Sequence, residues 1–133
     1  MGDVDMKISE IAILSGLSSS TIRYYEKLKI IRNVSKGADG NRCFTDADLK
    51  WIQFLSGFKD ARIPLKEMIH YADLYYCGDT TIDQRLVLLH NHHKELLDEQ
   101  IQIQKAIEFI ERKVSFYENK KKNIKDHSDL NCL

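Results

Sequence analysis

The segment SSSTIRYYEK, from Ser18 to Lys27, combines small hydroxyl residues with an arginine and two tyrosines. If it forms a helix that starts after Ser18, then Ser19, Ser20 and Lys27 share one outward face with Arg23, because each lies three or four positions from it. Small residues let a helix start approach a phosphate or a base edge, and arginine and tyrosine donate hydrogen bonds to phosphate oxygens. The segment predicts a helix that contacts nucleic acid. The alternative interpretation is an ordinary solvated helix.

The distribution of charge supports the nucleic-acid interpretation, although the whole chain carries no formal net charge. Between Arg23 and Arg42 there are six basic residues and two acidic ones, so a basic segment is hidden in the total. Clustered Lys and Arg residues are the electrostatic signature of a protein that binds phosphate backbones. Lys36 and Arg42 belong to this segment and lie beyond the candidate helix, where they add to its basic surface.

Two short helices joined by a turn are predicted to position the basic face. Residues 7–16 carry apolar side chains at helical spacing, and Gly16 is a natural C-terminal stop. Ser18 is a suitable N-cap for the second helix, with Leu17 and Ile22 placed to form a hydrophobic staple. Two helices joined by a turn that contains glycine form a helix-turn-helix. The apolar stripe of the first helix is expected to comprise Ile8, Ile11, Ala12 and Leu14.

A wing and two further helices are predicted to follow. Residues 30–44 place short apolar pieces around a centre rich in Gly, Asn and Asp, which indicates a two-stranded hairpin. Thr45 and Asp48 are placed to form the capping box of a third helix, and Pro64 is expected at the first position of a fourth. The fold class expected is therefore mainly α, with a winged helix-turn-helix head. The core residues expected on the third helix are Leu49, Ile52, Phe54, Leu55 and Phe58.

A long amphipathic pattern begins after the CGDTT segment of residues 77–81. Alternate steps of four and three residues from Ile82 to Tyr117 cover five heptads, and nine of the eleven positions are apolar or aromatic. This repeat predicts a coiled-coil helix roughly 54 Å long. The head is too small to bury such a seam, so the expected partner is a second copy of the chain. The two polar positions, His93 and Gln100, are expected to fix the register. The predicted seam comprises Ile82, Leu86, Leu89, His93, Leu96, Gln100, Ile103, Ile107, Ile110, Val114 and Tyr117.

The expected division of the chain is a head at 5–76, a hinge at 77–81, a dimerisation helix at 82–118 and a flexible tail at 119–133. No apolar run approaches the ~20 residues of a membrane span, and the acidic start has no secretory signal, so the expected location is cytoplasmic. No nucleophile elbow, P-loop, GxGxxG or HExxH motif is present, which argues against an enzyme. The HNHH run at residues 90–93 spreads around a helical turn, and neither a metal nor a cofactor is expected.

The stretches MKISEIAILSGLSSSTIRYYEKLKII and GNRCFTDADLKWIQFL resemble the MerR family of bacterial transcription regulators, and the resemblance extends along the long helix. It implies a homodimer, joined by an antiparallel coiled coil, on a two-fold-symmetric promoter operator. The second helix would enter the major groove and the wing would contact the backbone. The protein would distort the DNA so that RNA polymerase engages the promoter. The residues expected at the DNA are Ser19, Ser20, Thr21, Arg23, Tyr24, Tyr25, Lys36, Arg42 and Lys59.

The three cysteines bear on which signal such a regulator would sense. The resemblance is closest to the short branch linked to thiol-reactive or aldehyde stress, because the sixteen residues after Tyr117 are too few for an effector domain. That branch carries a cysteine near Gly57, which this chain lacks. Cys77 is then the candidate thiol sensor, with an incidental cysteine as the alternative. Cys43 in the wing is expected to be a partly buried small residue, and Cys132 stands alone in the tail.

Arg62 departs from the family pattern. Relatives often have glycine at this position, in the DARIP corner between the third and fourth helices. A left-handed backbone at this corner would strain an arginine by about 1 kcal/mol, because its Cβ approaches the following carbonyl oxygen.

A coiled-coil adaptor is the alternative function. In that case the long helix would be the working part, and the head would bind a protein rather than DNA. The basic face of residues 18–27 distinguishes the two functions, because an adaptor has no use for a salt-sensitive affinity for DNA. The expected partners are therefore double-stranded promoter DNA and a second copy of the chain. RNA polymerase would be engaged indirectly through the DNA, and no membrane is expected.

Overall fold

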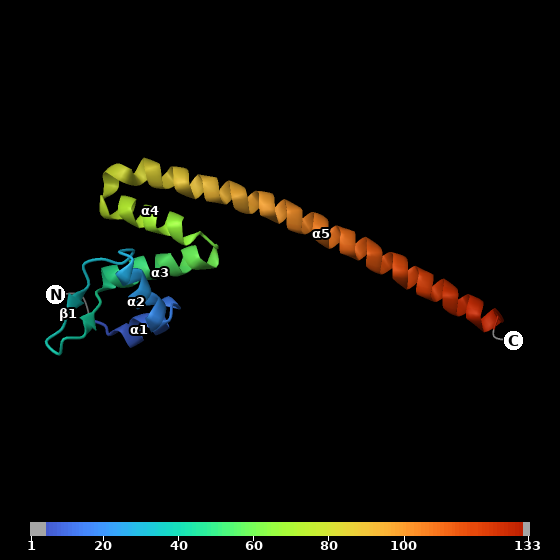
Figure 1. The fold of residues 1–133 in the computed structure, drawn as a ribbon, viewed down its shortest axis with the longest axis horizontal. Helices are drawn as coiled ribbons and strands as arrows, with labels where there is room; N and C mark the ends of the chain where they lie inside the picture. The colour runs from blue at the N-terminus through green and yellow to red at the C-terminus, as the bar shows by residue number, and fades with distance from the viewer. Residues whose placement is uncertain (1–4, 132–133) are drawn as a thin grey trace. The chain divides into compact units, whose positions relative to one another are not determined.

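The computed structural model describes the backbone of residues 5–131 and the side chains of residues 5–125. It has two compact units, the first ending at Leu89 and the second beginning at His90. Figure 1 shows the succession of elements. The described helices are α1 (Ile8–Ser15), α2 (Ser19–Lys27), α3 (Asp46–Asp60), α4 (Leu65–Tyr76) and α5 (Ile82–Asn131), with strands β1 (Ser35–Lys36) and β2 (Arg42–Cys43) and a 3-10 turn η1 (Asp79–Thr81). A mainly α fold with a winged helix-turn-helix and a long helix is confirmed.

The helix-turn-helix of α1 and α2 forms as its capping residues predict. Gly16 adopts a left-handed backbone (φ 80°), and its N–H donates to the carbonyl of Ala12 at 3.0 Å, which ends α1. The hydroxyl of Ser18 accepts from the backbone N–H of Thr21 at 3.1 Å, which starts α2. Ile22 is fully buried, so α2 is held against the core by one face while its opposite face stays exposed. The turn therefore fixes which side of α2 faces solvent.

The wing is a short antiparallel hairpin in which Ser35 pairs with Cys43 and Lys36 with Arg42. It is shorter than the sequence predicted, because Ile30 and Ile31 leave the sheet and bury completely in the core. The backbone N–H groups of Ile30 and Ile31 donate to the carbonyl of Tyr25, at 2.9 and 3.2 Å. The two residues therefore continue from the end of α2 and are not part of a strand.

Helix α3 is the centre of the core. The Thr45 hydroxyl accepts from the Asp48 N–H at 3.1 Å, and the Asp48 carboxylate accepts from the Thr45 N–H at 3.0 Å, which confirms the capping box. Leu14 and Phe54 were predicted to be core residues, but both are exposed. Each lies outside the row of buried side chains on its helix. The core is built from Met6, Ile11, Leu17, Ile22, Tyr25, Ile30, Ile31, Phe44, Trp51, Ile52, Leu55, Phe58, Met68, Tyr71 and Ala72.

The segment between α4 and α5 is bound tightly to its neighbours. Gly78 has a positive φ of 90°, which reverses the chain. The buried hydroxyl of Thr81 donates to the carbonyl of Leu74 at 2.5 Å and lies 2.8 Å from the carbonyl of Gly78. At the other end of α4, Pro64 is the N-cap rather than the first helical residue, because its ψ of 145° is extended.

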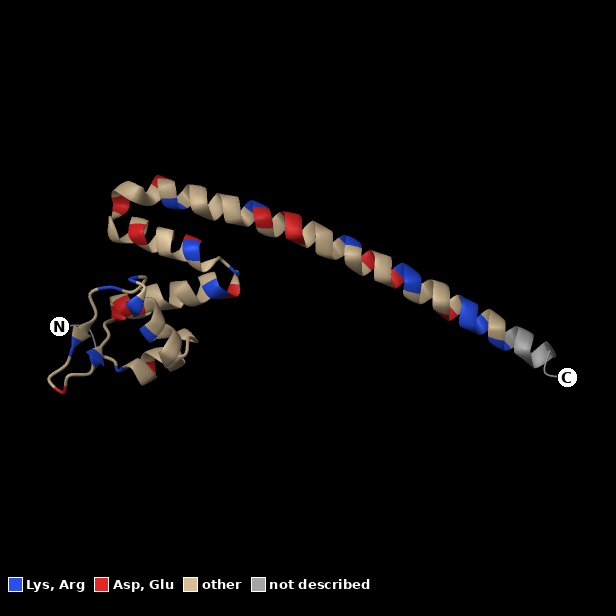
Figure 2. Cartoon of the chain, in the orientation of Figure 1, with Lys and Arg blue, Asp and Glu red and all other residues tan. Residues whose placement is uncertain are grey.

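Helix α5 continues to Asn131, whereas the sequence predicted a tail from residue 119. Residues 119–131 contain no Gly or Pro, so nothing in this stretch interrupts a helix that has already started. Lys, Arg, Asp and Glu residues of both signs are interspersed along α5, as Figure 2 shows. No described helix is long and apolar enough to cross a membrane. Along α5 the side chains of Leu86, Ile103, Ile107, Ile110, Val114 and Tyr117 are exposed in the single chain.

Replacing Arg62 with glycine is expected to stabilise the fold. Arg62 has a φ of 60°, which confirms the left-handed backbone at the corner between α3 and α4. Glycine adopts this conformation without a Cβ clash, so the free energy of unfolding should rise by about 1 kcal/mol. Thermal unfolding at a fixed chain concentration measures the change. The matched control is Ala61→Gly, which should destabilise, because the φ of Ala61 is an ordinary −77°. An unchanged or lower melting temperature for Arg62→Gly would contradict the strain.

Candidate nucleic-acid interface

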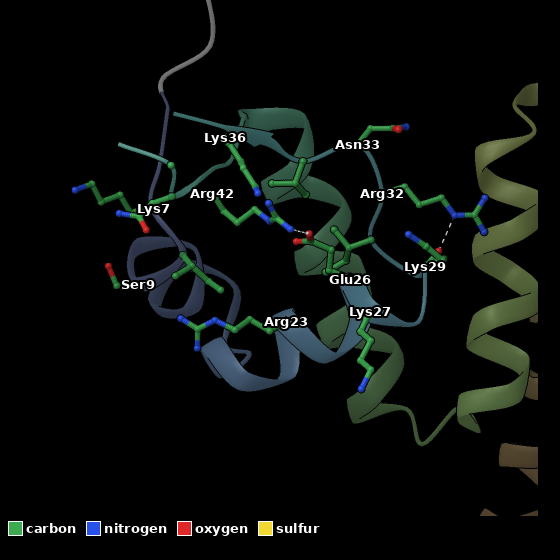
Figure 3. A pocket seen from close by; sticks show the side chains of 15 residues that line it. Lys7, Ser9, Arg23, Glu26, Lys27, Lys29, Arg32, Asn33, Lys36 and Arg42 are labelled. Atoms are coloured by element: carbon green, nitrogen blue, oxygen red, sulfur yellow. Dashed lines mark hydrogen bonds and ion pairs between the residues drawn. The ribbon is translucent and has the colours of Figure 1, made fainter. Parts of the chain in front are cut away.

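A basic groove lies between the first two helices and the wing. It has a volume of about 1130 Å³ and is lined by residues of α1, α2, the wing and the segment that joins α2 to the wing. Figure 3 shows the 15 side chains that line it. The basic ones are Lys7, Arg23, Lys27, Lys29, Arg32, Lys36 and Arg42. Glu26 is the one acidic residue among the lining side chains that the structure describes.

Helix α2 brings the predicted contact residue Arg23 to the groove, together with Lys27, which was predicted to share its face. Arg23 and Lys27 are exposed and line it, one turn apart on the same face. Tyr24 is exposed beside them but does not line the groove. Ser19, Ser20 and Thr21 lie at the start of α2, outside the groove lining. The Thr21 hydroxyl lies 2.8 Å from that of Ser18, which places it in the N-cap of the helix.

Tyr25 was predicted to face DNA, but the structure places it in the core. Its side chain is only 6 % exposed. Burial raises the pKa of its hydroxyl, and the neighbouring Tyr24 adds to the rise, so the ring is neutral at physiological pH. The tyrosine pair splits because adjacent residues on a helix point about 100° apart. Tyr25 therefore supports the helix from beneath and is removed from the contact set proposed below.

The wing supplies Lys36 and Arg42 from opposite strands of its hairpin. The guanidinium of Arg42 lies 2.5 Å from the carboxylate of Glu26, so this ion pair joins β2 to α2. Because both side chains are partly exposed, the pair contributes little to overall stability, but it sets where the Arg42 charge lies in the groove. At the wing tip, hydrogen bonds from the backbone and side chain of Asn41 lower the pKa of Asp39 and close the turn.

Three further basic residues line the groove without having been predicted as contacts. Lys29 and Arg32 belong to the basic segment that the sequence shows, and Lys7 precedes α1. Arg32 is engaged elsewhere. Its guanidinium pairs with Asp73 of α4 and lies 4.7 Å from the centre of the Tyr76 ring. Arg32 therefore joins the wing segment to α4, while Lys7 and Lys29 add positive charge to the groove.

Lys59 is the predicted contact that the groove does not include. It is exposed in the last turn of α3, and it is absent from the lining residues. A role at the DNA for Lys59 stays a prediction.

The two cysteines among the described side chains differ in exposure. Cys43 is partly buried, as the sequence predicted, and its sulfur would lie 3.0 Å from a Cβ added at Gly37. Cys77 is exposed at the C-cap of α4. Its role as a thiol sensor stays a prediction, and Cys132 lies outside the described residues.

The geometry suits a polyanion that runs past both α2 and the wing. Arg23 and Lys27 of α2 line the groove, and so do Lys36 and Arg42 of the hairpin. Cations on two sides of an open groove match phosphates that succeed one another along a backbone, whereas a single phosphate would engage one side alone. At the start of α2, Ser20 is exposed and Ser19 and Thr21 are partly exposed. The arrangement is therefore that of a DNA-binding surface.

Comparison with known proteins gives one answer. The sequence profile of the MerR HTH family regulatory proteins matches residues 6–74. An uncharacterized HTH-type transcriptional regulator of Haemophilus influenzae is 34% identical, over 80% of this chain and 78% of that protein. The HTH-type transcriptional regulator AdhR of Bacillus subtilis is 31% identical, over 70% of this chain and 66% of that protein.

The structural comparison agrees. The crystal structure of HiNmlR, a MerR family regulator lacking the sensor domain and bound to promoter DNA, superimposes with a TM-score of 0.74. The two sequences are 31% identical, and the match covers 89% of this chain and 94% of HiNmlR. These similarities favour DNA over protein as the partner of the helix-turn-helix head, against the adaptor alternative.

Proposed function

This chain belongs to the MerR family of DNA-binding transcriptional regulators, and we propose that it acts as a homodimer on a two-fold-symmetric promoter site. The observation that carries the proposal is the basic groove, where Arg23 of α2 and Lys36 of the wing lie on two sides of one surface. In each head, α2 enters the major groove and the hairpin contacts the adjacent phosphate backbone. The proposed contact set is Ser19, Ser20, Thr21, Arg23, Tyr24, Lys36, Arg42 and Lys59.

The long helix supports the homodimer. Most of its seam residues are exposed in the single chain, whereas Leu89 and Leu96 are partly buried. An exposed apolar stripe of this length is unfavourable unless another helix covers it. Antiparallel pairing of two copies would cover most of the apolar layers and place one head at each end. The two recognition helices then face successive major grooves, one or more helical turns apart along the DNA.

The proposed distortion of the operator has its cause in the paired α5 helices, which hold the two heads at a fixed spacing. A dimer whose heads do not match the groove spacing of straight DNA can engage both half-sites only if the DNA bends or untwists. Such deformation costs several kcal/mol, which the contacts to phosphates must offset. The deformed promoter then aligns the two elements that RNA polymerase reads. In this way the protein reaches the polymerase through the DNA.

Replacing Arg23 with alanine tests the proposed contact surface. Loss of this arginine should weaken binding to a promoter fragment by about 1–3 kcal/mol, roughly 5- to 150-fold. The slope of affinity against salt concentration should also become shallower, because one phosphate contact fewer releases fewer counterions. Titration of labelled DNA across a salt series measures both. The matched control is Lys94→Ala on the exposed surface of α5, which removes the same charge away from the groove. An equal loss in both variants would mean that the groove is not the contact surface.

A further inference from the structure

A second cleft in the head is aromatic rather than basic. It has a volume of about 280 Å³ and is lined by Lys50, Trp51, Phe54, Tyr71, Tyr75 and Arg85. The rings of Trp51 and Tyr75 stack face to face, with centroids 3.9 Å apart. Phe54 and Tyr75 remain 41% and 37% exposed in the single chain. Exposed aromatic rings gathered around one cleft are typical of a surface that another protein segment covers.

The first turns of α5 show which of its faces lies against this cleft. The guanidinium of Arg85 lies 5.8 Å from the centre of the Tyr75 ring, and Leu88 and the seam residue Leu89 both pack against the core. In the heptad that puts Leu86 at position a and Leu89 at position d, Arg85 occupies position g and Leu88 position c. The head is therefore on the c and g side of the helix, next to the seam.

Symmetry carries this assignment to the other end of the partner helix. Two antiparallel helices are related by a two-fold axis perpendicular to the plane that contains them both. Rotation about such an axis exchanges the two helices. A side chain that lies above the plane of the helices is still above it after the rotation. Positions c and g of both helices therefore lie on the same side of the pair. The c and g positions in the C-terminal half of the partner helix then face toward this chain's head.

The residues at those positions are aromatic. Phe109 and Phe116 both occupy position c, and both rings are at least half exposed in the single chain. Lys113 at position g lies between them, with its ammonium 5.7 and 5.9 Å from the two ring centres. An apolar pair on the outside of a coiled coil has no role in the seam itself.

The register brings this pair level with the cleft. Layers of an antiparallel coiled coil match position a with position d. The two registers that pair most of the seam place Leu86 opposite the partner's Ile110 or opposite the partner's Tyr117. When Leu86 lies opposite the partner's Ile110, the partner's Phe109 is level with Val87. When Leu86 lies opposite the partner's Tyr117, the partner's Phe116 is level with Val87. Because the two phenylalanines are one heptad apart, a slip of one heptad exchanges one ring for the other at the same place.

We propose that the segment Phe109–Phe116 of a second copy covers the aromatic cleft of this chain's head, an inference that rests on the antiparallel homodimer proposed above. The phenylalanine rings bury apolar surface against Trp51 and Tyr75. Their faces also complement the cations of Lys50 and Arg85, which border the cleft. Each head is thereby held by its partner's helix as well as by its own, so the spacing of the two recognition helices is fixed by contacts between the chains.

Site-directed cross-linking tests the contact with surface substitutions. In a chain whose native cysteines are replaced by serine, Lys50→Cys places a thiol at the rim of the cleft. A second, size-tagged chain carries Lys113→Cys. A short bismaleimide should then join the two chains in a mixed dimer. The matched control is Lys105→Cys in the tagged chain, at the outward position f of the same helix, which should give little product. Native mass measurement on the same samples reports whether dimers are present.

The outcomes separate the contact from the dimer. Cross-linking through Lys113→Cys but not Lys105→Cys supports the contact. Adding Phe109→Ala and Phe116→Ala to the tagged chain should then lower the yield while the mass remains that of a dimer. A dimer that cross-links at neither position, or equally at both, overturns the contact and leaves the homodimer intact. A monomeric mass for the wild-type chain overturns both.

Discussion

An Ile107→Asp variant is expected to be monomeric and to lose its preference for promoter DNA. Ile107 lies near the middle of the C-terminal half of the α5 seam, and it is exposed in the single chain. In the homodimer the substitution removes two buried isoleucines, worth about 3–6 kcal/mol together on the scale of 1.5–3 kcal/mol for each buried side chain. It would also place two carboxylates in an apolar seam, where an unpaired buried charge is unfavourable. His93 and Gln100 are expected to lower the stability of the seam already, because polar residues at seam positions fix the register at a cost in stability.

Loss of the dimer has a direct consequence for DNA binding. One head alone has only its own half-site contacts, so the second head no longer binds at the high effective concentration that the coiled coil provides. Sedimentation measures the mass, and a DNA titration measures the affinity. The matched control is Asn91→Asp, which adds the same carboxylate at an outward position f of α5 and should leave both unchanged. A dimeric Ile107→Asp protein would contradict the seam as the sequence pattern defines it.

Replacing Trp51 with alanine should have the largest effect on the stability of the head. Trp51 is 6 % exposed and stacks on Tyr75, and its indole N–H donates to the carbonyl of Ile30 at 2.9 Å. Removing a buried tryptophan leaves a cavity and lowers the free energy of unfolding by about 3–5 kcal/mol. The carbonyl of Ile30 also loses its donor, and an unsatisfied buried acceptor is unfavourable.

Urea unfolding followed by far-ultraviolet circular dichroism measures this effect, with the chain concentration held fixed because the proposed dimer would add to stability. Phe54→Ala is the matched control. It removes another ring of the same cluster, but one that is 41% exposed in the single chain, so the loss should be below that of Trp51→Ala. Equal losses in the two variants would show that Trp51 does not hold α3 against the rest of the head.

Local signals in the sequence were sufficient for most of the fold. Gly16, Ser18, Thr45 and Asp48 each satisfy backbone groups at a helix end, so their types predict the element boundaries. The exposure of Phe54 was not predicted, because apolar residues along a helix show which face is buried but not how much of that face the neighbouring elements cover. The extension of α5 beyond residue 118 was also missed, because a charged helix carries no buried stripe to identify it.

The sequence predicted which basic residues line the groove better than it predicted which way individual side chains point. Arg23, Lys27, Lys36 and Arg42 were identified from charge and spacing, and the structure brings all four to one groove. The burial of Tyr25 was not predicted, because its neighbour Tyr24 has the same side chain and only the rotation of α2 separates their environments. Pairings over long sequence distances, such as Arg42 with Glu26 and Arg32 with Asp73, depend on how the wing and α4 pack against α2.

Selection of DNA fragments from the genome that encodes the chain tests the central claim most directly. The purified wild-type protein is mixed with sheared genomic DNA at moderate salt, and the bound fragments are sequenced. The account predicts enrichment of a few promoter fragments that share one two-fold-symmetric site, with affinity for that site falling steeply as salt is raised. Recovery of fragments no different from random genomic DNA would contradict it, since a dimer of these heads would then have no sequence to read.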